Sequence, residues 1–101
     1  MDKKIAPSSR LEAIKHINEN HKGNNAETQA NRALEAFQKF NSLTTQDLRH
    51  DFDIMHPAGR VKELRGRFFE ILTIWESYPT ASGKFHRMAR YVYMGSEGSP
   101  A

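Results

Sequence analysis

The sequence predicts an α+β fold in which helices come first and a β-hairpin comes last. Up to Gly66 the apolar residues recur at spacings of three and four, which is the period of amphipathic helices. After Gly66 the period falls to two, and β-branched and aromatic residues dominate, as is typical of strands. With 101 residues, of which 38% are apolar, the chain is expected to form one domain with a modest core.

The composition of the chain excludes several classes of function. It has no cysteine, which excludes disulfides, thiolate catalysis and cysteine-containing zinc sites. It has no glycine-rich phosphate loop and no meaningful Ser, His and acid spacing, so we expect neither an enzyme nor a cofactor. No apolar run is long enough for a signal peptide or a membrane span, and the expected location is the cytoplasm.

The net charge of +3 is divided unevenly along the chain. Residues 1–56 hold eight Lys and Arg against eight Asp and Glu, whereas residues 57–93 hold seven against three. Basic surfaces bind polyanions by releasing counterions, so the second half is the candidate nucleic-acid surface. The alternative is that this excess is an ordinary solvated surface.

Residues 1–24 are expected to form a tail and a short helix outside the main domain. The S-x-x-E motif at Ser9 has the spacing of a capping box, and it should open a helix that ends by Asn20. The single apolar stripe of this helix must be buried, either on the domain or on a second copy. Docking on the domain is the simpler interpretation, and the alternative is a homodimer through residues 9–20. The stripe consists of Leu11, Ile14 and Ile17.

A longer helix is predicted over residues 26–40, at the start of a domain that spans residues 25–94. Its apolar residues recur at spacings of three and four and should face the core. The charged residues, Arg32 among them, are expected to lie outside this stripe. The stripe consists of Ala30, Ala33, Leu34, Phe37 and Phe40.

Two shorter helices are predicted next, joined by a connection over residues 53–56. Thr44 and Asp47 have the capping-box spacing at the start of the first of these helices. Pro57 suits the first position of the second helix, where its missing N–H costs nothing. Ile54 is expected to fill the corner between them. The inward residues are predicted to be Leu48, Phe52, Val61 and Leu64, with Phe68 following them.

The C-terminal third is predicted to form an antiparallel hairpin followed by a flexible tail, residues 95–101. The alternating pattern leaves two candidate faces for burial, and we favour the face that carries Ile71 and Trp75. The hairpin consists of strands over residues 68–76 and 86–94 and a loop over residues 77–85.

Three helices followed by a β-hairpin is the element order of a winged helix-turn-helix, here with an extra N-terminal helix. A helix about 10 to 12 Å across fits the DNA major groove, which is about 12 Å wide. Residues 58–67 are expected to read that groove, the preceding helix to bind a phosphate at its N-terminus, and the wing tip to contact the backbone. The predicted DNA-binding residues are Thr44, Thr45, Gln46, Gly59, Arg60, Lys62, Glu63, Arg67, Lys84, His86 and Arg87.

Three runs of sequence carry a family resemblance: TTQDLRHDFDIMHPAGRVKELR, then EILTIWE, then GKFHRMARYVYM. Over about Thr28 to Met94 the chain resembles a family of small winged helix-turn-helix domains of bacteria, phages and prophages. The chain departs from the family at Phe68, where a glycine usually ends the reading helix. The resemblance implies double-stranded DNA as the partner, and we expect a small regulator of transcription or accessory factor of a phage or mobile element.

Some of these side chains have a structural alternative to DNA contact. Arg60 would form an ion pair with Asp47 or Asp51. Arg65 is expected to pack its stem at the edge of the core, and Arg90 to pair with an acidic residue across the hairpin. The acidic residues available to Arg90 are Glu70 and Glu76.

A second hypothesis is a protein-interaction module with the same fold, for example a phage-encoded inhibitor of a host or defence protein. The net-neutral first half and the apolar stripe of residues 9–20 favour a protein partner. Tyr91 and Tyr93 are expected in the core rather than as a base-stacking platform. A metal site is disfavoured, because the chain lacks cysteine and lacks a carboxylate-plus-histidine motif at ligand spacing.

Overall fold

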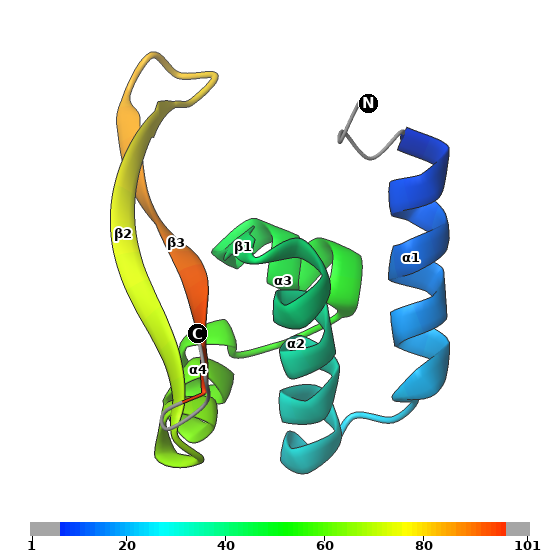
Figure 1. Cartoon of the computed structure of the whole chain (residues 1–101). Helices are drawn as coiled ribbons and strands as arrows, with labels where there is room; N and C mark the ends of the chain where they lie inside the picture. Colours follow the sequence, from blue (N-terminus) through cyan, green and yellow to red (C-terminus); the bar gives the residue numbers. More distant parts are fainter. Residues whose placement is uncertain (1–6, 97–101) are drawn as a thin grey trace, which may run out of the picture.

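The computed structural model describes residues 7–96, with side chains from Ser9 onward, and the remainder of the two predicted tails lies outside this range. Within it the chain forms four helices and a three-stranded antiparallel sheet, and one short strand of that sheet comes between the second and third helices (Figure 1). This is the α+β class predicted from the change of period. The elements are α1 (Pro7–Asn20), α2 (Ala26–Phe40), β1 (Ser42–Thr44), α3 (Thr45–Phe52), α4 (Pro57–Gly66), β2 (Phe69–Pro79) and β3 (Phe85–Ser96).

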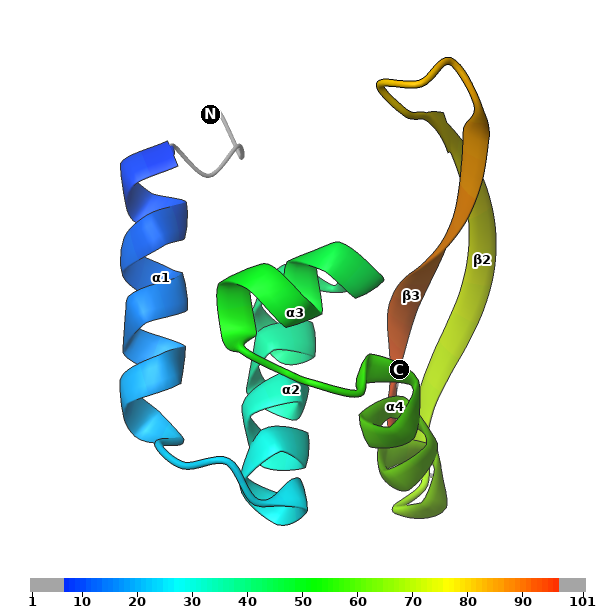
Figure 2. The ribbon, with the colours of Figure 1, turned by 180° about the vertical axis from the view of Figure 1, so that it is seen from behind.

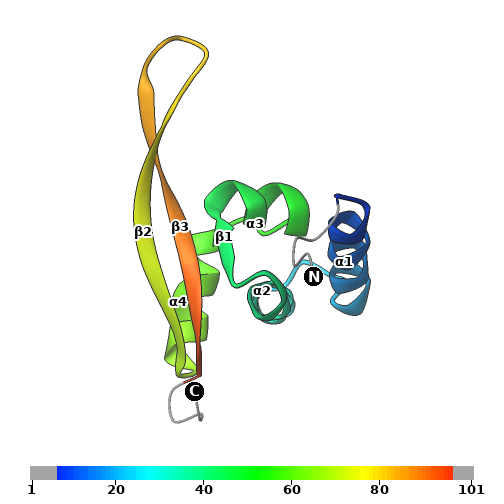
Figure 3. The same cartoon turned by 45° about the horizontal axis from the view of Figure 1, so that its top comes forward.

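The elements are arranged in successive layers. Helix α1 lies on one side of α2 and α3, and the sheet lies on the other side, as the tilted view in Figure 3 shows. From behind, α4 lies beside the lower part of β2 (Figure 2). The hairpin of β2 and β3 continues well past α2, α3 and α4, so these helices do not cover its upper part (Figures 1 and 2).

Helix α1 docks on its own domain. Ile14 and Ile17 are buried, and the Asn18 side-chain amide donates to the backbone carbonyl of Asp51 in α3 at 2.9 Å. The docking interpretation is therefore confirmed. The predicted start at Ser9 is wrong, because the helix begins at Pro7, a residue whose fixed φ and missing N–H suit a first turn.

Helix α2 has the predicted bounds, and Asn25 caps its N-terminus by accepting from the Thr28 amide at 2.8 Å. The expectation that Arg32 lies outside is wrong, since only 4% of this residue is exposed. Its guanidinium donates to the backbone carbonyls of Phe52 at 2.6 Å and Asp53 at 3.2 Å. It also donates to the carbonyls of His21 and Gly23 in the α1–α2 connection. Burial lowers the pKa of Arg32 from its ordinary value, and the nearby Asp53 carboxylate opposes this shift.

The short strand β1 was not predicted. It pairs with β3, and Leu43 lies opposite Tyr91 in that register. The predicted capping box follows it directly: the Asp47 amide donates to the Thr44 hydroxyl at 3.0 Å, and the Thr44 amide donates to the Asp47 carboxylate at 2.9 Å. One short segment therefore ends a strand and starts α3.

Helix α4 begins at Pro57 as predicted and ends at Gly66, one residue before the predicted end. Val61, Leu64 and the corner residue Ile54 are at most 1% exposed, which confirms them as core. Phe68 does not continue that stripe. It is 66% exposed and adopts a left-handed backbone with φ of 72°, so its predicted inward position is wrong.

The hairpin is longer than predicted at its tip and at the end of β3, whereas β2 begins at Phe69, one residue after the predicted start. Residues 80–84 form the loop, and β3 extends through two residues that were assigned to the flexible tail. Of the face favoured for burial, Ile71 is 4% exposed but Trp75 is 59% exposed. The predicted face is buried at the base of the hairpin but not towards its tip, because the strands extend beyond the helices that cover them.

Candidate nucleic-acid interface

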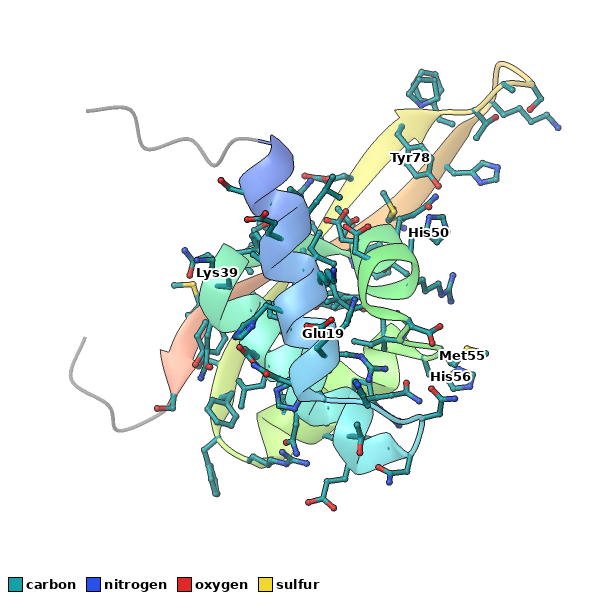
Figure 4. The ribbon with its side chains drawn as sticks, turned by 90° about the vertical axis from the view of Figure 1, so that its right-hand side faces the viewer. Glu19, Lys39, His50, Met55, His56 and Tyr78 are labelled. Carbon is teal, nitrogen blue, oxygen red and sulfur yellow. The ribbon has the colours of Figure 1, made fainter. Side chains whose placement is uncertain are left out.

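An open groove of about 680 Å³ lies between the N-terminal ends of α3 and α4 and the hairpin. In Figure 4, Tyr78 of β2, His50 of α3 and His56 before α4 follow one another along one side of the molecule, with Lys39 on the opposite side. The lining residues are Thr45, Gln46, Arg49, His50, His56, Pro57, Ala58, Gly59, Trp75, Tyr78, Arg87, Met88, Ala89 and Tyr91.

The groove has the charge that a polyanion requires. Its cations are Arg49 of α3 and Arg87 of β3, and His50 and His56 add polar ring nitrogens. Among the described residues that line the groove, none carries a carboxylate. Concave surfaces with one sign of charge concentrate counter-ions of the other sign, so this groove favours phosphate.

The wing side of the groove is built from β2 and β3. Ser77 lies opposite Arg87 in the register, and Trp75 lies opposite Ala89. The Arg87 guanidinium carbon lies 4.9 Å from the centroid of the Trp75 ring, a cation–π contact that holds the guanidinium over the strand. A basic group is thereby fixed on the groove side of the wing.

Three residues at the start of α3 were predicted to bind a phosphate, and the structure gives them different environments. Thr44 is 6% exposed, and its hydroxyl is used by the capping box. Thr45 lines the groove, but its hydroxyl donates to the carbonyl of Ala89 at 3.4 Å. Gln46 is exposed and lines the groove, so it is the one of the three that is placed to reach a ligand.

The predicted reading helix presents a different face from the one expected. Gly59 lines the groove together with Ala58, and Lys62 is exposed one turn further on. The Arg60 side chain is only 15% exposed and donates to the Glu63 carboxylate at 3.1 Å. The alternative of an ion pair between Arg60 and an aspartate of α3 is wrong, since its partner is its neighbour on α4.

Arg67 is also turned away from the groove. Its guanidinium donates to the Asn31 side chain of α2 at 2.9 Å. The spacing of Arg60, Glu63 and Arg67 places them on one side of α4, and this bond shows that the side near Arg67 faces α2. Lys62 is exposed and follows the groove residues Ala58 and Gly59 by four and three positions, so it shares their face of α4.

Two arginines expected to be structural have structural partners. Arg65 donates to the Ile71 carbonyl at 2.9 Å through Nε and to the Thr73 hydroxyl at 2.9 Å, which ties α4 to β2. Arg90 donates to the Glu76 carboxylate at 2.9 Å, one of the two partners predicted for it.

The remaining predicted residues lie at the wing tip or in the core. Lys84 is exposed in the hairpin loop, and His86 is exposed with its ring 6.3 Å from that of Tyr78. Tyr91 is buried, and Tyr93 stacks on Phe37 with the ring centroids 6.3 Å apart. The core assignment of the two tyrosines is confirmed.

Sequence reasoning missed Arg49, His50, His56 and Trp75 as groove residues. The sequence spacing could have predicted Arg49 and His50. They follow Gln46 by three and four positions and so share its face of the helix. No such signal exists for Trp75, whose place in the groove depends on how far the hairpin extends.

The described residues offer neither a metal-binding cluster nor a membrane-spanning helix. Residues 7–96 contain no group of three His, Cys, Asp or Glu side chains placed to hold a metal ion. In the same range no helix has the length and apolar character needed to cross a membrane. The cytoplasmic location stays a prediction.

Comparison with known proteins agrees with the fold. No match is found among the curated proteins or among the solved structures. A family model described as a winged helix-turn-helix domain matches residues 28–96, which include α3, α4 and the whole hairpin. The four helices and the three-stranded antiparallel sheet of residues 7–96 have that architecture. The chain belongs to the winged helix-turn-helix domain family.

Proposed function

We propose that this protein binds double-stranded DNA through the groove and the exposed face of α4, as a small transcriptional regulator or accessory factor of a phage or mobile element. The observation that carries the proposal is the convergence of α3, α4 and the wing on one groove with cationic side chains and no carboxylate among its described lining residues. Winged helix-turn-helix domains typically bind DNA, and the resemblance to phage and prophage domains supports the cellular role.

The proposed docking follows the geometry of α4. Ala58 and Gly59 are small, so the first turn of α4 can approach base edges closely, and Lys62 lies on the exposed side one turn later. In this docking, Gln46 and Arg49 of α3, which line the groove, contact the phosphates that flank the major groove. Arg60, first expected to read a base, would have to leave Glu63 before it could do so.

A charge-removal experiment tests the groove. Arg49→Ala and Arg87→Ala should each weaken binding to every duplex and should lower the slope of log K against log salt by about one. The measurement is fluorescence anisotropy of a labelled duplex between about 50 and 200 mM salt. Lys39→Ala is the matched control, because Lys39 is an exposed cation on the opposite side of the molecule (Figure 4).

The groove would be rejected as the DNA surface if Lys39→Ala changed the salt slope as much as the two groove variants did. An intact fold with no affinity for any duplex at low salt would reject DNA binding altogether.

The protein-interaction module has less support. Ile14 and Ile17, the residues expected to meet a partner, are buried on the domain, and only Leu11 of that stripe is exposed, at 67%. A homodimer through residues 9–20 would have to form without the two buried isoleucines.

A further inference from the structure

The upper half of the wing exposes large aromatic side chains that contribute nothing to the core. Trp75 is 59% exposed and Phe85 is 72% exposed. Apolar surface of this size is normally removed from water on folding, and where it gathers in one place on a folded protein it marks a binding surface. The packing of the described residues does not account for the exposure of these two side chains.

The two aromatic residues and Arg87 share one side of the hairpin. Successive side chains of a strand alternate between faces, so Phe85, Arg87 and Ala89 lie on the same side of β3, about 6.8 Å apart along the strand. Trp75 lies opposite Ala89, which places it on that side as well. The Arg87 guanidinium, 4.9 Å from the centre of the Trp75 ring, therefore lies between the two aromatic residues along the strand. We call Trp75, Arg87 and Phe85 the wing patch.

The hairpin tip next to the wing patch carries positive charge only. Residues 77–89 include Lys84 and Arg87 and no Asp or Glu. The nearest acidic residue along β2, Glu76, has its carboxylate bound by Arg90 at 2.9 Å. Aromatic rings interleaved with cations are what single-stranded nucleic acid requires, because bases stack on the rings while the cations neutralise phosphates.

The hairpin turn holds Phe85 in place. The Thr80 amide donates to the Lys84 carbonyl at 2.7 Å, and the Gly83 amide donates to the Thr80 carbonyl at 3.0 Å. Gly83 has a φ of 85°, a conformation that a residue with a side chain rarely adopts. Because the turn is closed by these bonds, little chain entropy remains to be lost when a ligand binds next to it.

We propose that the wing patch binds the unpaired bases of a single-stranded DNA segment that adjoins a duplex. A duplex shows a protein only the edges of its bases, since neighbouring base pairs cover their faces, whereas unpaired bases offer faces for stacking. Trp75 and Arg87 also line the groove proposed for the duplex, so a strand that leaves the duplex there meets the patch directly. The inference rests on the proposed function for the duplex part of the ligand.

The experiment uses three DNA probes: a blunt duplex, the same duplex with an unpaired thymidine fork at one end, and the single strand alone. The full chain should bind the fork roughly tenfold more tightly than the blunt duplex, an effect within the range for stacking of one base. Trp75 is the only tryptophan of the chain, so its fluorescence reports on the patch itself. We expect the fork to quench it more strongly than the blunt duplex does, because only unpaired bases can stack on the ring.

Matched variants test whether the preference for the fork comes from the wing patch or from exposed apolar surface in general. Phe85→Ser should remove the preference for the fork and leave blunt-duplex affinity within about twofold. Phe68→Ser is the control, because Phe68 is 66% exposed but lies at the base of the hairpin, and it should keep the preference. Trp75→Ser, measured by anisotropy of labelled DNA, should also remove it. Circular dichroism checks that each variant is folded.

The outcomes separate this inference from the proposed function. Equal affinity for fork and blunt duplex, with no additional quenching by the fork, would overturn the inference and leave duplex binding intact. Binding of the single strand with quenching, but of no duplex, would support the patch and overturn the proposed function. No binding of any probe would overturn both. A dimer that Phe85→Ser dissociates, with DNA binding unchanged, would assign the patch to a second copy and overturn the inference.

Discussion

Arg32 joins three parts of the structure through one guanidinium. Its side chain extends from α2 and donates to the backbone carbonyls of Phe52 and Asp53 at the end of α3. It also donates to the carbonyls of His21 and Gly23 between α1 and α2. Carbonyls at a helix end have no partner within the helix and must be satisfied from elsewhere. The buried arginine therefore replaces water at a place where helix ends meet.

Arg32→Met tests this role at the scale of one residue. The variant should lose about 2 to 4 kcal/mol of unfolding free energy, because the carbonyls stay buried and lose their donor. Urea denaturation followed by circular dichroism measures this loss. Arg49→Met, on the exposed side of α3, should change stability by less than about 0.5 kcal/mol. Equal stability of the two variants would contradict the account.

Phe68 is held in a backbone conformation that suits glycine. Its φ of 72° brings its Cβ too close to the chain, and its side chain is 66% exposed and gains little from packing. Phe68→Gly should raise the unfolding free energy by about 0.5 to 1 kcal/mol, since relief of strain exceeds the added entropy of the unfolded chain. Thermal unfolding measures it, and a lower melting temperature would show that the Phe68 ring supports the hairpin.

At the scale of elements, α1 is part of the domain rather than a separate arm. Ile17 is 2% exposed against the domain, whereas Leu11 on the same helix is 67% exposed. Ile17→Ala should therefore cost about 2 to 4 kcal/mol of unfolding free energy, and Leu11→Ala should cost almost nothing. Light scattering on both variants measures whether either substitution changes the oligomeric state. If Leu11→Ala alone dissociated a dimer, α1 would be an oligomerisation arm after all.

The elements that the sequence predicted well have local causes. The Thr44 and Asp47 capping box, Pro57 at the start of α4 and the apolar spacing of α2 act within one or two turns, and each was placed correctly. Strand β1 has no local cause. Its three residues become a strand only by pairing with residues 90–92, far along the chain.

The misplaced side chains depend on tertiary packing in the same way. Trp75 has the alternation of a buried residue, but burial ends where the helices end, and the sequence does not show how far they reach along the hairpin. Arg60 has the position of an outward cation, yet Glu63 one turn away takes its guanidinium. The sequence therefore predicted which helices and strands form the site, but only some of the residues that line it.

At the scale of the whole molecule, the described structure has two different sides. The labelled groove residues Tyr78, His50 and His56 lie on one side, and Lys39 of α2 lies on the opposite side (Figure 4). The sheet and α1 lie on opposite sides of α2 and α3 (Figure 3). The basic excess of residues 57–93 falls on the elements of the groove side. The cations Arg60, Arg65 and Arg90 of this stretch are bound within the fold, which leaves fewer cations for DNA than the sequence count indicates.

The most direct test of the proposed surface is a chemical-shift titration of the 11.6 kDa chain with duplex DNA, read from amide resonances. We predict that shifts concentrate at the starts of α3 and α4 and in the wing, around Arg49, Lys62 and Arg87. The amides on the outer face of α1, around Lys15 and Glu19, should not move. Shifts confined to α1 and the outer face of α2, with the groove amides unchanged, would contradict the account.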